Sequence, residues 1–135
     1  MSVIFDNPST APAPLADRYS NVAAIDLGSA TMLVLSGQVA MDYDGSFVGE
    51  DMTAQSEQIF QAIGGMLSAY GGGFEHVVNI RTYLTDMDLL AEYGAVRRKH
   101  ITGTPPTSTT IEVSRLFRPE ALLEVEVTAV VPRVG

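Results

Sequence analysis

The segment that most constrains this chain lies near its C-terminal end, where residues 122–131 read LLEVEVTAVV. In a β-strand, alternate side chains point to opposite faces, so Glu124 and Glu126 would share one face. The other face would carry only apolar side chains, those of Leu123, Val125, Val127 and Ala129. A strand with one apolar face must be covered by other elements, so we expect a sheet with a second layer packed against it.

Hydrophobic patterns and turn residues predict further strands and two helices. The strands are expected at residues 3–5, 19–27, 31–36, 77–85, 108–113 and 122–132. The helices are expected at 52–70, with Asp51 as the N-cap, and at 88–101. The pair Gly64-Gly65 in the first helix predicts close backbone packing there. In this order, β-β-β-α-β-α-β-β, two helices can cover only one face of the sheet. We therefore expect an α+β fold in which other copies of the chain cover the second face.

Composition argues against several kinds of partner and site. The 135 residues are expected to form one domain, 1–135, with an extended N-terminal arm at 1–16 in which the proline-rich part, 7–16, lies on the surface. A net charge of −8 repels nucleic acid, and no apolar run reaches the roughly 20 residues of a membrane span. The chain has no cysteine and its N-terminus lacks the features of a signal peptide. We therefore expect a cytoplasmic protein without disulfides or thiolate metal sites.

Glu124 is the first candidate for chemistry. A carboxylate held on a rigid strand between aliphatic neighbours can act as a base or orient a water molecule, and the alternative is an ordinary exposed sheet face. Ser36-Gly37 ends a predicted strand, where glycine lets a ligand approach the backbone, although a plain strand-ending turn also explains it. Ser108 and Thr110 follow a proline and offer hydroxyl donors, but they are also ordinary strand residues.

Two arginines are candidates for binding an anion. Arg97 belongs to the basic cluster 97–100 near the end of the second predicted helix, where the helix dipole already favours cations. Its functional alternative is to bind a carboxylate across a subunit boundary. Arg81 lies in the middle of a predicted strand and needs a partner carboxylate or an exposed face, so it is the other candidate. His76 and His100 have no third ligand at metal-binding spacing, so no metal site is predicted.

Several short motifs stand in an order that is typical of one protein family. They are Tyr19, Leu35-Ser36-Gly37-Gln38, Ala54-Gln55, Tyr83-Leu84-Thr85-Asp86-Met87, Pro106, Ile111-Glu112-Val113 and Leu123-Glu124-Val125-Glu126. Over about residues 17–133 the chain resembles the RidA/YjgF/UK114 (Rid) family. The resemblance implies a chorismate-mutase-like fold, with a curved mixed β-sheet backed by two helices, and a homotrimer with three clefts between subunits.

The resemblance also implies a reaction. Family members with deaminase activity release ammonia from reactive imines and enamines such as 2-aminoacrylate, with no metal or organic cofactor. By similarity, Glu124 orients the attacking water, the backbone near Ser36-Gly37 positions the substrate, and Tyr19 lines the cleft from a neighbouring subunit. This chain departs from the family where Ser108 replaces the arginine that grips the substrate carboxylate, and where Thr110 replaces a common cysteine.

Three functions are compatible with these residues. The first is a Rid-type hydrolase of a small imine or enamine other than plain 2-aminoacrylate, with Arg81 or Arg97 in place of the missing arginine. The alternative is a non-catalytic trimer that binds a small metabolite or a protein in the same cleft. The third is lyase or cyclisation chemistry on a chorismate-like or polyene acid. The retained Glu124 favours the first.

Overall fold

A computed structural model of the chain describes residues 2–133, and Met1 and residues 134–135 lie outside the described part. Within it, six strands form one sheet in the order β1-β2-β3-β6-β4-β5. Their bounds are β1 Val3–Asp6, β2 Val22–Asp26, β3 Ala30–Leu35, β4 Val77–Leu84, β5 Thr107–Glu112 and β6 Leu123–Pro132. Neighbouring strands are antiparallel except β4 and β5, which are parallel. The sheet is therefore mixed, as expected.

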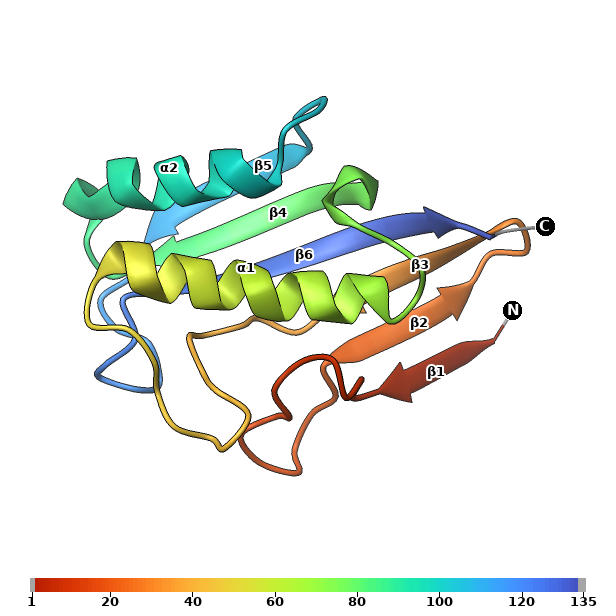
Figure 1. Cartoon of the computed structure of the whole chain (residues 1–135), viewed down its shortest axis with the longest axis horizontal. Coiled ribbons are helices and arrows are strands. Elements are labelled where there is room, and N and C mark those ends of the chain that lie inside the picture. The colour runs from red at the N-terminus through yellow and green to blue at the C-terminus, as the bar shows by residue number, and fades with distance from the viewer. Residues whose placement is uncertain (1, 134–135) are drawn as a thin grey trace.

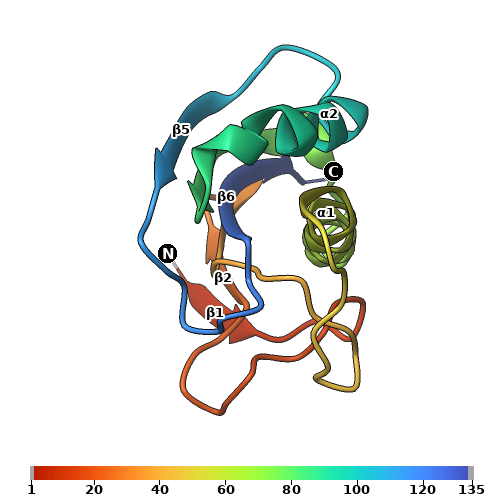
Figure 2. The same cartoon turned by 90° about the vertical axis from the view of Figure 1, so that its left-hand side faces the viewer.

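Two helices lie on one face of this curved sheet, α1 (Met52–Ser68) in front of its middle strands and α2 (Leu90–His100) beside β4 and β5 (Figures 1 and 2). One-turn helices, η1 (Phe74–His76) and η2 (Met87–Leu89), precede β4 and α2. Asp51 caps α1 as predicted, since its carboxylate accepts a hydrogen bond from the Ala54 N–H at 2.8 Å. The chain turns away after α1 at Gly71, whose φ of 74° disfavours other residues. The expected α+β fold with two helices on one face is confirmed.

The hydrophobic core lies between the sheet and the helices. Along β6, buried and half-buried residues alternate, with Val125 fully buried and with Glu124 and Glu126 on the opposite face. In the described chain no helix covers that opposite face (Figure 2), and Val34 of β3 is 39% exposed there. A single chain thus leaves one sheet face without a second layer.

The segment expected as a surface arm packs against α1. Ala11 is buried in the core cluster, and the Thr10 hydroxyl donates a hydrogen bond to the Gly65 carbonyl at 2.6 Å. A Cβ atom on Gly65 would overlap the Thr10 carbonyl oxygen. The close backbone packing predicted for the glycine pair is therefore present at Gly65, and it fixes part of residues 7–16 on the helix.

The first long strand is shorter than the range 19–27 predicted for it. It begins at Val22, because the Asn21 N–H donates at 2.8 Å to the Asn7 side chain instead of pairing across the sheet. Tyr19 therefore lies in a loop, which determines where its ring can reach.

Candidate functional site

The structure gathers four of the predicted site residues in one open cleft. Glu124 projects from β6 on the face away from the helices and lines a cleft of about 580 Å³ with Tyr19, Ser36 and Gly37. The remaining lining residues are Leu15, Ala16, Arg18, Phe117 and Glu126. Tyr19, in the loop before β2, lines this cleft of its own chain. That Tyr19 also lines the cleft of a neighbouring subunit, as the resemblance implies, stays a prediction. One chain thus supplies the carboxylate, the turn and the tyrosine.

Gly37 makes room for the Glu124 carboxylate. A Cβ atom at this position would overlap Glu124 Oε2. The two segments cannot easily move apart, because Gln38 and Val125 exchange backbone hydrogen bonds of 2.8 and 3.0 Å. A side chain at position 37 would therefore push the carboxylate out of its place.

The environment of Glu124 favours its protonated form. Burial raises the pKa of Glu124 above its usual range, and the negative charge of Glu126 on the same face raises it further. Glu126 accepts a hydrogen bond of 2.6 Å from the Tyr83 hydroxyl, and this bond, more than burial, raises the pKa of that phenol. A carboxyl group with a raised pKa is suited to accept and return a proton during a reaction.

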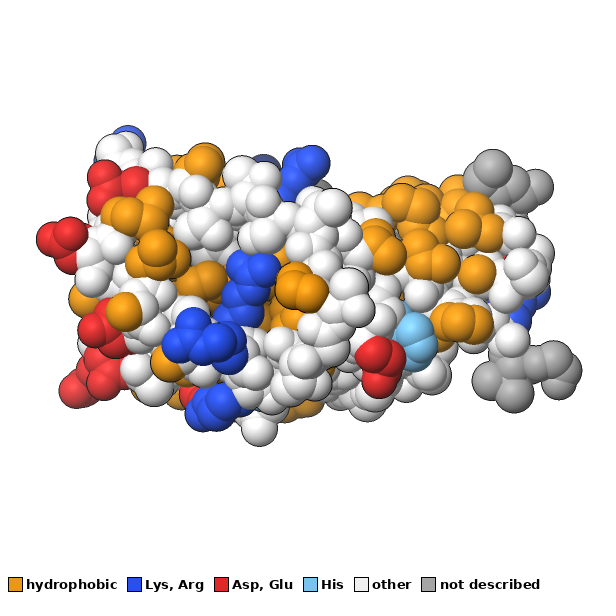
Figure 3. Space-filling model, turned by 90° about the horizontal axis from the view of Figure 1, so that it is seen from above, with side chains coloured by type: hydrophobic (Ala, Val, Ile, Leu, Met, Phe, Trp, Pro, Cys, Tyr) orange, Lys and Arg blue, Asp and Glu red, His pale blue; other side chains and the backbone are white. Residues whose placement is uncertain are grey.

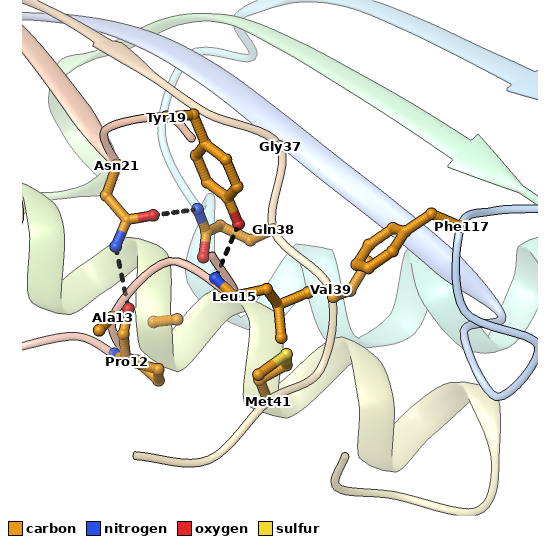
Figure 4. A pocket seen from close by; sticks show the side chains of 11 residues that line it. Pro12, Ala13, Leu15, Tyr19, Asn21, Gly37, Gln38, Val39, Met41 and Phe117 are labelled. Atoms are coloured by element: carbon orange, nitrogen blue, oxygen red, sulfur yellow. Dashed lines mark hydrogen bonds between the residues drawn. The ribbon is translucent and has the colours of Figure 1, made fainter. Parts of the chain in front are cut away.

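A polar network lies beside the cleft, around a second and smaller pocket that shares Tyr19 and Gly37 with it (Figure 4). The buried Asn21 side chain donates to the Pro12 carbonyl at 2.9 Å and accepts from Gln38 Nε2 at 3.3 Å. The Tyr19 hydroxyl accepts from the Leu15 N–H at 3.2 Å and closes the loop between them. A cavity of about 30 Å³ lies among these residues, a size suited to one water molecule. The network joins the N-terminal segment to the turn after β3.

Ser108, Thr110 and Arg97 lie on the other face of the sheet. Ser108 and Thr110 pair in register with Ile80 and Thr82, which are buried beneath the helices, so all four side chains share the helix face. Arg97 Nη1 donates to Ser108 Oγ at 3.0 Å. With Thr110, Arg97 lines an open groove of about 670 Å³ between α2 and β5. These residues are therefore together, but apart from Glu124.

The view onto α2 and β5 shows Lys and Arg side chains gathered between patches of hydrophobic surface (Figure 3). The basic residues of the last turn of α2 are Arg97, Arg98, Lys99 and His100. Lys99 pairs with Glu57 of α1, and His100 lies 3.3 Å from the same carboxylate. Part of this cluster thus joins the two helices, which leaves Arg97 and Arg98 to line the groove.

Arg81 lies on the same sheet face as Glu124 but outside its cleft. It is exposed and stands opposite Glu126 in the β4–β6 register. With Asn79 and Glu126 it lines a smaller hollow of about 140 Å³. Glu126 separates this hollow from the cleft because it lines both.

Four residues of the cleft, Leu15, Ala16, Arg18 and Phe117, were not singled out from the sequence. Arg18 directly precedes Tyr19, and the family motif draws attention only to the tyrosine. Phe117 lies in the bend between β5 and β6, where no periodic pattern exists, and it is 62% exposed. A large aromatic residue in such a bend is the signal that could have identified it.

Within residues 2–133, no three His, Asp or Glu side chains converge in a way that could hold a metal ion. In the same part of the chain, no helix combines the length and the apolar character needed to cross a membrane.

Comparison with known proteins shows which family and which individual proteins this chain is similar to. The family model for endoribonuclease L-PSP matches residues 9–131. Protein DfrA of Myxococcus xanthus is 36% identical over 101 residues, which cover 74% of this chain and 76% of that protein. A 2-iminobutanoate/2-iminopropanoate deaminase of Salmonella typhimurium is 30% identical over 112 residues, which cover 81% of this chain and 85% of the relative.

A solved structure has the same fold. The crystal structure of the yeast protein YEO7 superposes with a TM-score of 0.86 at 25% identity, covering 98% of this chain and 100% of the yeast chain. The shared region includes both the cleft and the groove.

Proposed function

The chain belongs to the endoribonuclease L-PSP (RidA/YjgF/UK114) family, and from this premise we propose that it hydrolyses a reactive imine or enamine to a carbonyl compound and ammonia. The observation that carries the proposal is the half-buried Glu124 carboxylate, seated on Gly37 inside an open cleft. The relative named as a 2-iminobutanoate/2-iminopropanoate deaminase supports this reaction class.

Glu124 is the proposed catalytic residue. Its carboxylate accepts a proton from a water molecule while the water oxygen attacks the imine carbon. The proton then passes to the nitrogen and gives a carbinolamine. Transfer of the carbinolamine hydroxyl proton to the nitrogen lets the carbon–nitrogen bond break, and ammonia leaves a carbonyl compound behind. An imine carbon is already electrophilic, so positioning of the water and substrate supplies much of the required rate. The Ser36-Gly37 turn and Tyr19 are proposed to position the substrate.

The complete site is proposed to form between subunits of a homotrimer. Within one chain, Glu124 faces one side of the sheet, while Ser108, Thr110 and Arg97 face the other. These residues can meet around one substrate only if a second copy brings its groove to the cleft. The sheet face without a helix provides the surface for such an assembly.

The substrate is proposed to differ from plain 2-aminoacrylate. Ser108 offers a hydroxyl where the family usually supplies a guanidinium, and a bidentate charge-assisted contact is worth roughly 2–3 kcal/mol. Arg97 reaches Ser108 from α2 and can return a guanidinium to this neighbourhood. Arg81 is the less suitable substitute, since it lines a separate hollow.

Cleavage of RNA is not proposed, although the family carries that name. The chain has a net charge of −8, and the cleft itself contains two carboxylates. Both would repel a phosphate backbone.

An imine-hydrolysis assay tests the reaction. An amino-acid oxidase generates 2-imino acids in the presence of semicarbazide, which traps the imine that the protein has not yet hydrolysed. We expect wild type to lower the semicarbazone signal and Glu124→Gln to lose at least about 100-fold of that activity. Activity that persists in Glu124→Gln would refute the role of this carboxylate.

The variant Ser108→Arg separates the deaminase from a binding protein. If only Ser108→Arg is active, the cleft is competent but adapted to another substrate. If wild type, Glu124→Gln and Ser108→Arg are all inactive on every imine offered, a metabolite-binding trimer becomes the better account.

A further inference from the structure

Without Arg18, the charged side chains that line the Glu124 cleft would all be negative. The ionisable side chains in its lining, apart from Tyr19, are Glu124, Glu126 and Arg18. Two carboxylates alone would repel an anionic ligand, and at 4 Å two unit charges interact by about 1 kcal/mol even in water. Arg18 is thus the one lining residue, within the described chain, that can attract an anion into this cleft.

Arg18 has no ion-pair partner in the described part of the chain. There, the Lys and Arg side chains with a carboxylate oxygen within 4.0 Å are Lys99, Arg118 and Arg133. Glu124 and Glu126, although they line the same cleft, lie beyond this distance from the Arg18 guanidinium. An unpaired guanidinium retains its donors for a ligand.

A closed loop presents Arg18 at the rim. The Arg18 N–H donates to the Ala16 carbonyl at 2.7 Å, and the Leu15 N–H donates to the Tyr19 hydroxyl at 3.2 Å. The loop is further joined to β2 through the bond from Asn21 to the Pro12 carbonyl. Arg18 is therefore held next to the cleft by the loop that also positions Tyr19.

The walls of the cleft suit a planar hydrophobic group. Tyr19 is 44% exposed and Phe117 is 62% exposed, and both line the cleft with Leu15. Large aromatic residues left open at a concave surface are typical of ligand sites. A small three-carbon imine would leave most of this surface in contact with water.

The other candidate arginines do not line the Glu124 cleft of their own chain, and Arg97 would reach it only from a second copy. Arg97 already donates to Ser108 on the helix face, and Arg81 occupies the hollow beyond Glu126. Neither lines the cleft that contains Glu124 in its own chain.

We infer that Arg18 binds the carboxylate of an anionic substrate whose planar, unsaturated or aromatic body lies between Tyr19 and Phe117. The substrate class is thus a 2-imino or enamino acid with a bulky hydrophobic side chain. This inference rests on the proposed function for the reaction, but the anion contact itself can be tested without turnover.

Isothermal titration calorimetry with 2-oxo-4-phenylbutanoate tests the contact. This stable 2-oxo acid corresponds to the product of such a deamination, and its primary amide has the same shape without the charge. We expect Arg18→Gln to weaken binding of the acid about 10-fold and to leave binding of the amide unchanged. Added salt should weaken binding of the acid to wild type more than to Arg18→Gln, because salt screens an exposed ion pair.

Arg115→Gln is the matched control, since it removes the same charge from an exposed residue of the β5–β6 bend. It should alter binding of the acid by less than about twofold. Equal affinity of wild type and Arg18→Gln for the acid, an equal loss in Arg115→Gln, or no binding to wild type at millimolar acid would each overturn the inference.

Kinetics distinguish failure of this inference from failure of the proposed function. If wild type hydrolyses the bulky 2-imino acid and Arg18→Gln does so with the same kcat/KM, the reaction stands and the Arg18 contact is wrong. If no imine is hydrolysed but the acid binds in an Arg18-dependent manner, the contact stands and the deaminase is wrong.

Discussion

At the scale of single residues, the candidate site depends on Glu124, whose carboxylate is held where ionisation is unfavourable. Glu124 packs against the backbone of Gly37 and shares a sheet face with Glu126, whose carboxylate is held by the Tyr83 hydroxyl. Burial and the second negative charge both favour the neutral acid. Ionisation of Glu124 therefore lowers the free energy of unfolding. Such destabilised groups are common at functional sites.

Replacing Glu124 with Gln should stabilise the protein increasingly as the pH rises. The pKa of Glu124 in the folded chain is raised above the unfolded value of 4.5, so stability is lost as the pH rises from that value through the folded pKa. Gln stays neutral throughout. The melting temperature of Glu124→Gln should match wild type below pH 4.5, exceed it by a growing margin as the pH rises through the folded pKa, and exceed it by a constant margin above that pKa.

Glu50→Gln is the control for this pH series, because it removes an exposed carboxylate from a loop. A difference between Glu124→Gln and wild type that stays constant with pH would contradict the explanation. So would an equal trend in Glu50→Gln.

Gly37→Ala should separate folding from function. The added methyl group would overlap the Glu124 carboxylate, which is the movable end of a side chain. The carboxylate can therefore move aside, and the free energy of unfolding should fall by less than about 1 kcal/mol. The displaced carboxylate would no longer hold water correctly, and kcat/KM for imine hydrolysis should fall about 10- to 100-fold. Gly103→Ala is the control, since nothing lies within 4 Å of its added methyl group. Full activity in Gly37→Ala would show that the position of Glu124 does not matter.

At the scale of elements, α1 fixes the loops that form the cleft. The buried Gln55 side chain donates to the carbonyls of Gly49 and Glu120, at 3.1 and 2.8 Å, and accepts from the Leu122 N–H at 2.9 Å. The bend that carries Phe117 is thereby fixed to the helix. The N-terminal segment is held on the same helix through Thr10, so the two walls of the cleft share one support.

Gly65→Ala and Gly64→Ala form a matched pair that tests this support. Both remove a helical glycine and should gain up to about 1 kcal/mol of helix propensity. At Gly65, however, the new methyl group would overlap the rigid Thr10 carbonyl, whereas at Gly64 it would lie 3.3 Å from the Phe74 ring, which can shift. In urea unfolding, Gly65→Ala should lose about 1–3 kcal/mol and Gly64→Ala should be neutral or stabilised. Equal effects would mean that the segment around Thr10 does not press on the helix.

Elements that depend on nearby residues could be predicted, and contacts between distant segments could not. The alternation along β6 and the cap at Asp51 are local patterns, and both are confirmed. Which face Ser108 occupies depends on its register against Ile80, and no local pattern shows that two strands pair in parallel. Arg18 and Phe117 likewise share a cleft only because distant loops converge on β6.

At the scale of the whole molecule, a single chain presents two incomplete surfaces. The cleft with Glu124 and the groove with Thr110 lie on opposite faces of one sheet. The same sheet leaves one face without a helical layer, where Val34 is partly exposed. Association of copies would cover this face and join the cleft of one chain to the groove of another, so assembly and activity should fail together.

Val34→Glu should therefore dissociate the protein and abolish its activity. Light scattering of wild type should give a mass near three times 14.4 kDa, and the variant should approach 14.4 kDa, because a charge buried in an interface without a partner costs several kcal/mol. Circular dichroism should show that the variant keeps its secondary structure, since Val34 points away from the core. Tyr43→Glu, in an exposed turn where the tyrosine is 63% exposed, should leave both mass and imine hydrolysis unchanged. A monomeric wild type, or a monomeric Val34→Glu that retains full activity, would show that one chain completes the site alone.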